Sequence, residues 1–353
     1  MMYYKAQSSA VVSRSQSPVM NRTVKQHKSS LLIPSFLVFF VYFAITALYY
    51  SKESCQKLES FATNKNFNIV YKYLAEGKDK FNKFFTELKL KWINFDHLLI
   101  SIIATEMYRT LGLCSTIFPV NCVIPALFIT NKDAYKLISS EQSCWIALLI
   151  SIIIARNSIK IGEKCGIAQS LLTIYSSVLL AFSTLFMADS FFPSAVILVI
   201  QAFRGYKNKF AMAVVLSVSA AIFGALIVIF EDESLKEYIA FGYDNAQIAS
   251  GLKNSPVALI VILLGLVCFI GNYEKCYNAD VLLFAGIGCI FNFINNKSDA
   301  MAIFNTTLLL VYLIPFAASG ISNLPFYKFL CIGSAVYLLL FIIAIVKKNN
   351  AQI

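Results

Sequence analysis

Long runs of apolar residues, separated by short polar connections, cover most of the chain. Eleven runs have the composition of membrane-spanning helices: 31–50, 98–118, 119–131, 144–157, 166–187, 191–203, 210–230, 256–272, 280–295, 301–319 and 326–346. A helix needs about 20 apolar residues to cross the hydrocarbon core, and several runs are shorter. The apolar residues do not alternate with polar ones as barrel strands do. The pattern predicts an all-α integral membrane protein, a polytopic helical bundle of about 10 or 11 transmembrane helices.

The polar loop between the first two runs, residues 51–97, has its own helical period. Large apolar residues recur in it at helical spacing: Phe81, Phe84, Phe85, Leu88 and Trp92. Lysines line the other side: Lys80, Lys83, Lys89 and Lys91. A helix with one apolar and one basic side is suited to the membrane surface. We expect an amphipathic helix that either covers one end of the bundle or binds lipid headgroups.

Composition supports the membrane assignment. Of the 353 residues, 58% are hydrophobic and 14% are charged, which is too apolar for a soluble domain of this size. Much of the net charge of +11 lies at the edges of apolar runs, where it sets topology, so we expect no nucleic-acid partner. The nine cysteines are scattered without a C-x-x-C pair and are interpreted as small buried hydrophobes.

Charge in the connections predicts an orientation. Starting from a cytoplasmic N-terminus, the crossings place the basic connections 156–164 and 204–209 in the cytoplasm and an acidic loop, 231–255, outside. Two features oppose this orientation. The first outer loop, 51–97, holds nine lysines against six acids, and the two lysines of the C-terminal tail also fall outside if all eleven runs cross.

The same features divide the chain into three parts. Residues 1–30 carry five basic residues and no acidic one, and are expected to form a disordered cytoplasmic tail. Residues 31–346 form the membrane domain, and 347–353 a short second tail. The first apolar run begins only at Leu31 and lacks the layout of a signal peptide, so we expect it to remain as an uncleaved span.

The residue types that are missing restrict the chemistry. Histidine occurs only at His27 and His97, which excludes histidine metal clusters, H-E-x-x-H proteases and a serine–histidine relay within the membrane. The chain has no P-loop and no G-x-G-x-x-G motif. We expect no metal and no cofactor. Any catalysis would have to use carboxylates, lysine or arginine, and tyrosine.

A few charged residues lie inside or beside apolar runs, where each needs a physical reason. Glu106 and Arg109 are three residues apart on one helix face and can pair, either to hold helices together or to line a polar cavity. Asp189 is predicted to cap a helix that starts near Pro193, with catalysis as the alternative. Lys164 begins a run, and its ordinary role is a topology anchor.

The acidic loop 231–255 gathers aromatic rings with polar donors and acceptors. Its candidate ligand-binding residues are Tyr238, Tyr243, Asp244, Asn245, Gln247 and Lys253. Such a set can hold a polar, ring-shaped ligand such as a sugar. A carboxylate can also deprotonate an attacking hydroxyl, and a cation can stabilise a departing phosphate. The alternative is a solvated loop whose acids are placed by topology.

Five segments in order resemble the EpsG and Wzy-like polysaccharide polymerases of bacterial envelopes. They are "EGKDKFNKFF" (76–85), "FDHLLISIIATEMYRTLGL" (95–113), "EKCGIAQSLL" (163–172), "ADSFFPSAVILV" (188–199) and "EYIAFGYDNAQIASG" (237–251). The chain departs from the family pattern in three places. Lys164 replaces an arginine, Phe192 and Pro193 replace a histidine, and an arginine expected near Asp299 is missing.

The resemblance implies a membrane glycosyltransferase that polymerises oligosaccharide units carried on undecaprenyl diphosphate, for O-antigen, capsule or exopolysaccharide. Such enzymes work at the outer face of the bacterial cytoplasmic (inner) membrane, beside a chain-length regulator and a flippase. Asp79 or Asp244 would be the catalytic base. Arg109, Lys164 or Lys253 would stabilise the diphosphate, and Tyr243 would contact the sugar. Lys164 fits only if its span is inverted or broken, because the predicted orientation places it on the cytoplasmic side.

Two other functions remain open at this stage. The chain can be a transporter or flippase for a small solute or glycolipid, which predicts internal repeats and broken helices near the membrane midplane. It can also be a non-catalytic membrane scaffold, in which case the outer-loop carboxylates have no function.

Overall fold

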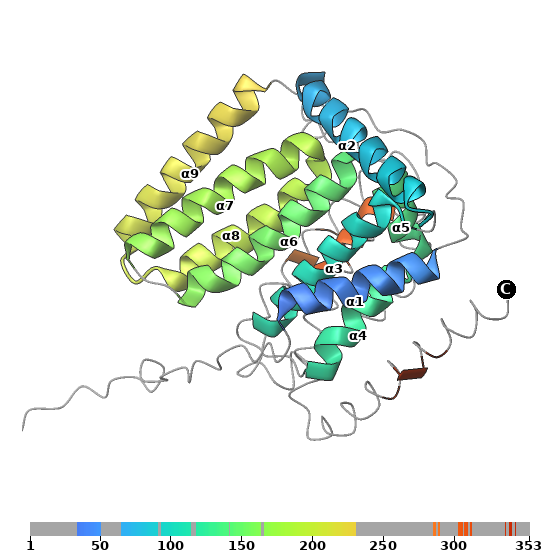
Figure 1. The fold of residues 1–353 in the computed structure, drawn as a ribbon. Helices are drawn as coiled ribbons and strands as arrows, with labels where there is room; N and C mark the ends of the chain where they lie inside the picture. The colour runs from blue at the N-terminus through green and yellow to red at the C-terminus, as the bar shows by residue number, and fades with distance from the viewer. Residues whose placement is uncertain are drawn as a thin grey trace, which may run out of the picture.

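A computed structural model of the protein describes residues 34–50, 65–90, 93–113, 118–140, 142–163 and 166–230, with isolated helical residues between 285 and 343. The helices are α1 (Ser35–Tyr49), α2 (Asn68–Glu87), α3 (Phe95–Leu113), α4 (Phe118–Ile129), α5 (Lys132–Ser140), α6 (Gln142–Glu163), α7 (Ile167–Phe186), α8 (Phe191–Gly205) and α9 (Lys209–Ile229). Short 3₁₀ turns, Lys65–Phe67 and Ala188–Ser190, precede α2 and α8. The described residues contain no strand, which confirms the all-α prediction for them (Figure 1).

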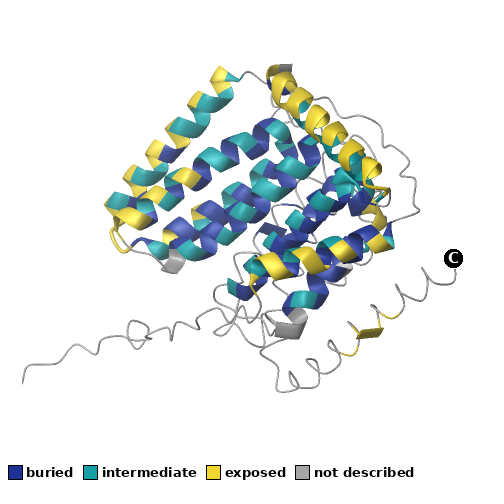
Figure 2. Ribbon diagram, viewed as in Figure 1, coloured by how far each residue is buried: buried dark blue, intermediate teal, exposed yellow. Residues whose placement is uncertain are grey.

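Three described helices are long and apolar enough to cross a membrane: Gln142–Ile161 within α6, and the whole of α7 and α9. Only 11% of the apolar stretch of the outer helix α9 is buried inside the protein. Figure 2 shows the exposed surface of α9 at the edge of the bundle. An apolar helix with so much exposed surface suits lipid rather than water. The predicted total of 10 or 11 crossings also depends on the runs after residue 256, which lie largely outside the described residues.

Three helix ends meet on one face of the bundle. Tyr50, directly after α1, stacks on Tyr135 of α5 with ring centroids 3.8 Å apart. The Tyr50 hydroxyl donates a 2.8 Å hydrogen bond to the carbonyl of Ile129, at the end of α4. His97, at the start of α3, lies over the same Tyr135 ring. The ends of α1 and α4 and the start of α3 therefore lie together.

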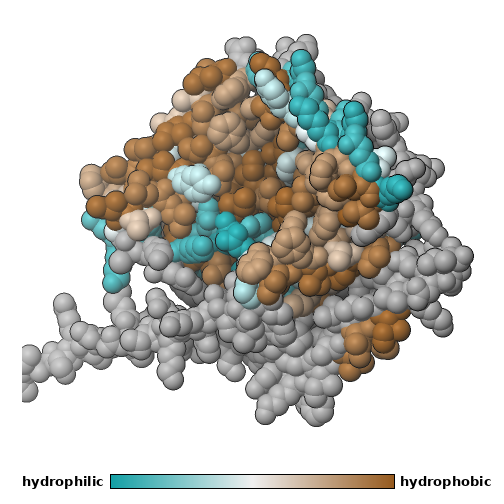
Figure 3. Space-filling view, viewed as in Figure 1, coloured by the Kyte–Doolittle hydropathy of each residue, from teal (hydrophilic) through white to brown (hydrophobic). Residues whose placement is uncertain are grey.

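Helix α2 lies across this same face, which we call the α2 face (Figure 1). At its start, Phe67 packs on Phe186, the last residue of α7, and on Phe230, which follows α9. Farther along, Lys78 bonds Asp96 in the first turn of α3. Since α7 and α9 end at the α2 face and α3 begins there, α7 and α9 run toward this face and α3 runs away from it. Figure 3 shows the hydrophilic side chains of α2 beside the apolar surface of the other helices.

The opposite end of the bundle is closed by a tight approach of three helix termini. A Cβ on Gly205, at the end of α8, would lie 3.1 Å from the carbonyl oxygen of Ile161 in α6 and would clash with the Gln169 amide of α7. Glycine therefore permits this close approach of α8 to α6 and α7. The Tyr206 hydroxyl lies within hydrogen-bond distance of Thr173, 3.3 Å away, which ties the same end of α8 to α7.

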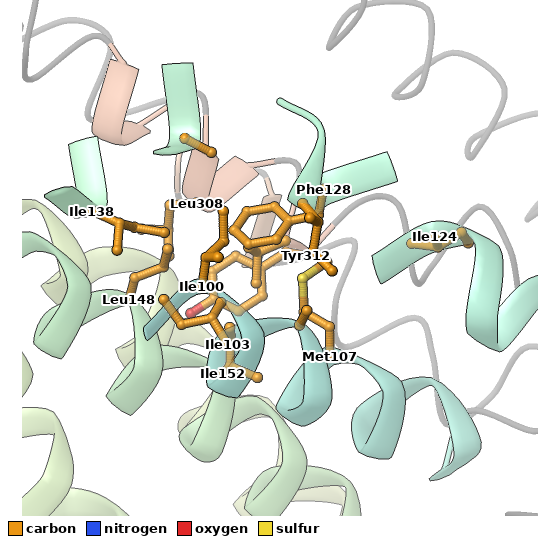
Figure 4. Close-up of a cluster of buried hydrophobic side chains, with 14 of the residues drawn as sticks. Ile100, Ile103, Met107, Ile124, Phe128, Ile138, Leu148, Ile152, Leu308 and Tyr312 are labelled. Atoms are coloured by element: carbon orange, nitrogen blue, oxygen red, sulfur yellow. The ribbon is translucent and has the colours of Figure 1, made fainter. Parts of the chain in front are cut away.

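The largest buried cluster surrounds α3 and α6 (Figure 4). Ile100, Ile103 and Met107 on α3 face Leu148 and Ile152 on α6. The other labelled contributors come from α4, α5 and the helical residues near 310: Ile124, Phe128, Ile138, Leu308 and Tyr312. Close packing of this kind holds helices together in lipid, where burial of apolar surface alone supplies little.

The amphipathic helix predicted in the first loop is present as α2, although its bounds differ from the apolar pattern. It begins at Asn68 and ends at Glu87. The N–H of Leu90 bonds the carbonyl of Phe85, and the N–H of Lys89 bonds that of Thr86. This is a Schellman motif with Lys89 in the left-handed region at φ 59°. The motif ends the helix before Trp92, which the spacing had placed on its apolar side.

Helix α6 is longer than the apolar run 144–157, because it continues to Glu163 through residues assigned to a connection. Arg156 does not end it, since this arginine is paired with a carboxylate on α3. The break comes instead at Gly166, whose φ of 67° and ψ of −140° suit glycine.

Candidate functional site

Three charged side chains meet between α3 and α6. The Arg109 Nη1 atom lies 2.6 Å from Glu106 Oε1, one turn earlier on α3. Arg156 reaches the other carboxylate oxygen, Oε2, from α6. We call Glu106, Arg109 and Arg156 the arginine–glutamate cluster. The predicted pairing of Glu106 with Arg109 is confirmed, and the structure adds a second guanidinium that the sequence analysis had assigned only to a basic connection.

The cluster carries a net positive charge, since two guanidinium groups share one carboxylate. Each guanidinium has five N–H donors and makes one hydrogen bond to Glu106. The Nε atom of Arg156 is buried and has no hydrogen-bond partner among the described residues. The side chains of Glu106 and Arg156 are each 14% exposed, whereas that of Arg109 is 40% exposed. An anion can therefore approach along Arg109 and find unused donors on both arginines.

The position of the cluster along the bundle can be read from α3. Arg109 follows Asp96, at the α2 face, by 13 residues on a continuous helix, which corresponds to about 20 Å of rise. Figure 3 shows a hydrophilic patch within the apolar surface, toward the ends of α3 and α6 that lie away from α2. The cluster is thus displaced from the α2 face toward the other end of the bundle.

Asp79 lies elsewhere. It is exposed on α2, next to Lys78, which contacts the first turn of α3. The structure does not bring Asp79 and Arg109 together, because they lie toward opposite ends of α3. The other predicted site residues, Lys164, Tyr243, Asp244 and Lys253, lie outside the described residues.

Two of the resembling segments, 76–85 and 95–113, contact each other at the α2 face. Lys78 Nζ lies 2.7 Å from Asp96 Oδ1, and the Phe95 N–H donates to Asn82 Oδ1 over 2.8 Å. Burial raises the pKa of Asp96, while the Lys78 ammonium opposes the shift. Burial lowers the pKa of His97 to about 4, so this imidazole is neutral at pH 7. A cavity of about 10 Å³ lies beside Lys78 and Asp96, with room for about one water.

The other two described segments, 163–172 and 188–199, lie at opposite ends of α7. The second contains Asp189, which is 3% exposed in the connection between α7 and α8. Its carboxylate accepts a 3.1 Å hydrogen bond from Asn305. The residue before α8 is Ser190, and the helix begins at Phe191 rather than near Pro193. The predicted capping position is therefore occupied by Ser190, and the described partner of Asp189 is a side chain from a distant segment.

Buried hydroxyl groups lie beside Asp189. Ser190 donates to the Met187 carbonyl and accepts from Ser183, 2.7 Å away on α7. Ser183 is in turn 3.2 Å from Ser151 on α6. Burial raises the pKa of Asp189 to about 7, and the hydrogen bond from Asn305 opposes this shift.

The buried Asp189 predicts a pH-dependent stability. The unfolded chain releases this proton near pH 3.8, whereas the folded protein keeps it up to about pH 7. Over that window the unfolded state binds fewer protons, so the free energy of unfolding falls as pH rises. We expect Asp189→Asn to flatten this fall in thermal unfolding of the detergent-purified protein. Asp133→Asn, an exposed substitution on α5, is the control, and parallel profiles for Asp189→Asn and the parent protein would contradict the prediction.

The described residues contain no group of three or more histidine, cysteine, aspartate or glutamate side chains that could hold a metal ion. The arginine–glutamate cluster can bind an anion through paired N–H donors, as guanidinium groups bind phosphate. Asp189 can hold or release a proton. Comparison of the chain with protein-family models, curated proteins and solved structures found no match.

Proposed function

We propose that this protein is a membrane glycosyltransferase that polymerises oligosaccharide units linked to a lipid diphosphate into a surface polysaccharide. The observation that carries the proposal is the arginine–glutamate cluster, a net positive group with unused N–H donors inside an apolar bundle. The cluster suits a phosphate-bearing substrate, and the resemblance of five segments to EpsG and Wzy-like polymerases indicates that this substrate is a lipid-linked oligosaccharide.

A glycosyl transfer of this kind releases a lipid diphosphate as the acceptor hydroxyl attacks the sugar. Negative charge grows on the bridging oxygen of the leaving group, and a fixed cation stabilises it. Arg109 and Arg156 present planar donor groups that match phosphate oxygens. Glu106 holds both guanidiniums in place before the substrate arrives, which limits the reorganisation needed in the reaction.

The acceptor hydroxyl also needs a base close to the departing diphosphate. Asp79 does not suit a diphosphate bound at the cluster, because about 20 Å of α3 separates the two ends. The acidic loop also starts at the α2 face, after Phe230. Asp244 is 14 residues farther along the chain, a length that can span about 20 Å when extended, so we retain it as the proposed base. Asp244→Asn is expected to shorten the glycan chains, and unchanged chain length would reject that assignment.

The depth of the cluster favours a second candidate function, a flippase for the same lipid-linked glycan. A flippase needs a cationic path for the phosphate through the bundle rather than a base beside it. The two functions predict different products when the protein is lost. Without a polymerase, single repeat units accumulate on the lipid carrier at the outer face; without a flippase, they accumulate on the cytoplasmic side.

The test is a gel profile of surface and lipid-linked glycan from a deletion strain complemented with variants. Parent protein and Lys207→Gln, which removes an exposed basic charge, are expected to restore long chains. Arg156→Gln is expected to reduce polymer by about 10²-fold or more, the usual effect of losing one transition-state donor. Arg156→Lys keeps the positive charge but loses the paired, planar N–H donors of the guanidinium. It should restore part of the product at equal protein level. An unchanged ladder in the deletion strain would reject both functions.

A further inference from the structure

Helix α2 presents three different stripes along its length. One stripe faces the bundle and consists of partly buried residues at helical spacing: Tyr71, Leu74, Lys78, Asn82 and Phe85. Contacts confirm its direction, since the Tyr71 ring meets Phe186 of α7 and Asn82 bonds the start of α3. No residue of α2 is fully buried, so the helix lies on the bundle rather than in it.

The two outward flanks differ in chemistry. With 3.6 residues per turn, Ile69, Tyr73 and Phe84 fall on one flank, and Val70 and Leu88 lie at its edge. These side chains are 41% to 69% exposed. We call them the apolar flank. The other flank carries exposed charged residues: Lys72, Glu76, Asp79 and Lys83. Lys80 and Glu87, also exposed, lie on the border between the two flanks, in line with Ile69.

The start of α2 lies at the level where two candidate membrane spans end. Its preceding residue, Phe67, packs on Phe186 at the end of α7, with ring centroids 4.7 Å apart, and on Phe230 after α9, 5.3 Å apart. The last residues of a span mark the boundary between hydrocarbon and headgroups. A helix that starts at this level and lies across the helix ends is placed at the membrane–water interface.

We propose that the apolar flank of α2 inserts into the lipid leaflet at the α2 face, while the charged flank faces water. The occupant of this surface is the upper part of the acyl chains, beside the headgroups. Exposed large side chains in this number are costly in water and favourable at that depth, where an amphipathic helix lies in the plane of the interface. The inference depends on the membrane location alone and holds whichever function the arginine–glutamate cluster serves.

Tryptophan fluorescence in vesicles tests this placement. In a Trp92→Phe/Trp145→Phe background, single tryptophans are introduced by Tyr73→Trp and Phe84→Trp on the apolar flank. Asp79→Trp and Lys83→Trp, on the charged flank of the same helix, are the matched controls. The full-length protein is reconstituted in phosphatidylcholine vesicles, with or without bromine on the acyl carbons nearest the headgroup. Equal thermal midpoints of the four variants in detergent establish that the fold is retained.

We expect brominated lipid to quench Tyr73→Trp and Phe84→Trp and to leave both control variants unchanged. Equal quenching of all four positions would overturn the proposal, because α2 would then have no water-facing flank. Blue-shifted but unquenched emission at residues 73 and 84 would also overturn it, since protein rather than lipid would then cover the apolar flank. Emission typical of water at both positions would show that the flank lies outside the leaflet.

Discussion

Glu106→Gln is expected to lower the free energy of unfolding by about 3 kcal/mol. The substitution leaves two guanidinium groups close together without the carboxylate that neutralises one of them. Breaking a buried ion pair by removing one partner costs about 3–5 kcal/mol, because the remaining charge is left uncompensated. The lower value applies because the Arg109 side chain is 40% exposed, whereas Glu106 and Arg156 are each 14% exposed. Thermal or denaturant unfolding of the purified protein in detergent measures the change.

Two further variants separate pair breaking from a general charge effect. Asp79→Asn removes an exposed carboxylate from α2 and should alter stability by no more than about 0.5 kcal/mol. Adding Arg156→Met to Glu106→Gln removes one of the two facing cations, so the double variant should be more stable than the sum of the single effects. If the double variant is strictly additive, the cluster is not a coupled unit.

Leu148→Ala is expected to destabilise the protein by about 2 kcal/mol, the lower end of the range of about 2–5 kcal/mol for such truncations in soluble cores. Leu148, on α6, is fully buried in the largest apolar cluster, around α3 and α6, so the truncation leaves a cavity. The lower end applies because the helices separate into lipid rather than water. Lipid solvates leucine as well as the protein interior does, which leaves mainly the loss of packing. Unfolding in detergent micelles or bicelles reports the difference.

The same truncation at an exposed position is the matched control. Leu171 lies on α7 and is 63% exposed, so Leu171→Ala removes the same atoms without opening an internal cavity. We expect its effect to stay within about 0.5 kcal/mol. Similar losses for both variants would show that α6 does not occupy the tightly packed centre of the bundle.

The helical class could be predicted because it depends on local properties. Unbroken apolar runs have one stable spanning form when lipid is the solvent, and the described helices follow the runs closely. The errors fall at helix boundaries and at α5 (Lys132–Ser140), which lies between two predicted runs in a stretch where no helix was predicted. Arg156 was taken as part of a connection, yet α6 continues through it because Glu106 compensates its charge. The end of α2 was misplaced because a Schellman motif depends on backbone conformation and not on apolar spacing.

The candidate site shows the same division between near and distant residues. Glu106 and Arg109 are three residues apart, so helix geometry alone predicts that they pair. Arg156 is 50 residues from Glu106 along the chain, and nothing in the spacing of either segment indicates the contact. The one available signal was that Arg156 lies within the apolar run 144–157 that became α6, because an arginine in such a run needs a partner. Likewise, Asp189 was recognised as unusual, but its partner Asn305 lies 116 residues away.

The order of apolar runs was sufficient to predict helices, a membrane location and an amphipathic helix in the first loop. These properties follow from the solvation of individual segments, which each segment carries in its own residues. Only the tertiary structure decided that Arg156 joins Glu106 and Arg109, that Asp79 lies far from them, and that α2 crosses the ends of the other helices. Such outcomes depend on how helices pack against one another, and packing is a property of pairs of surfaces that no single segment contains.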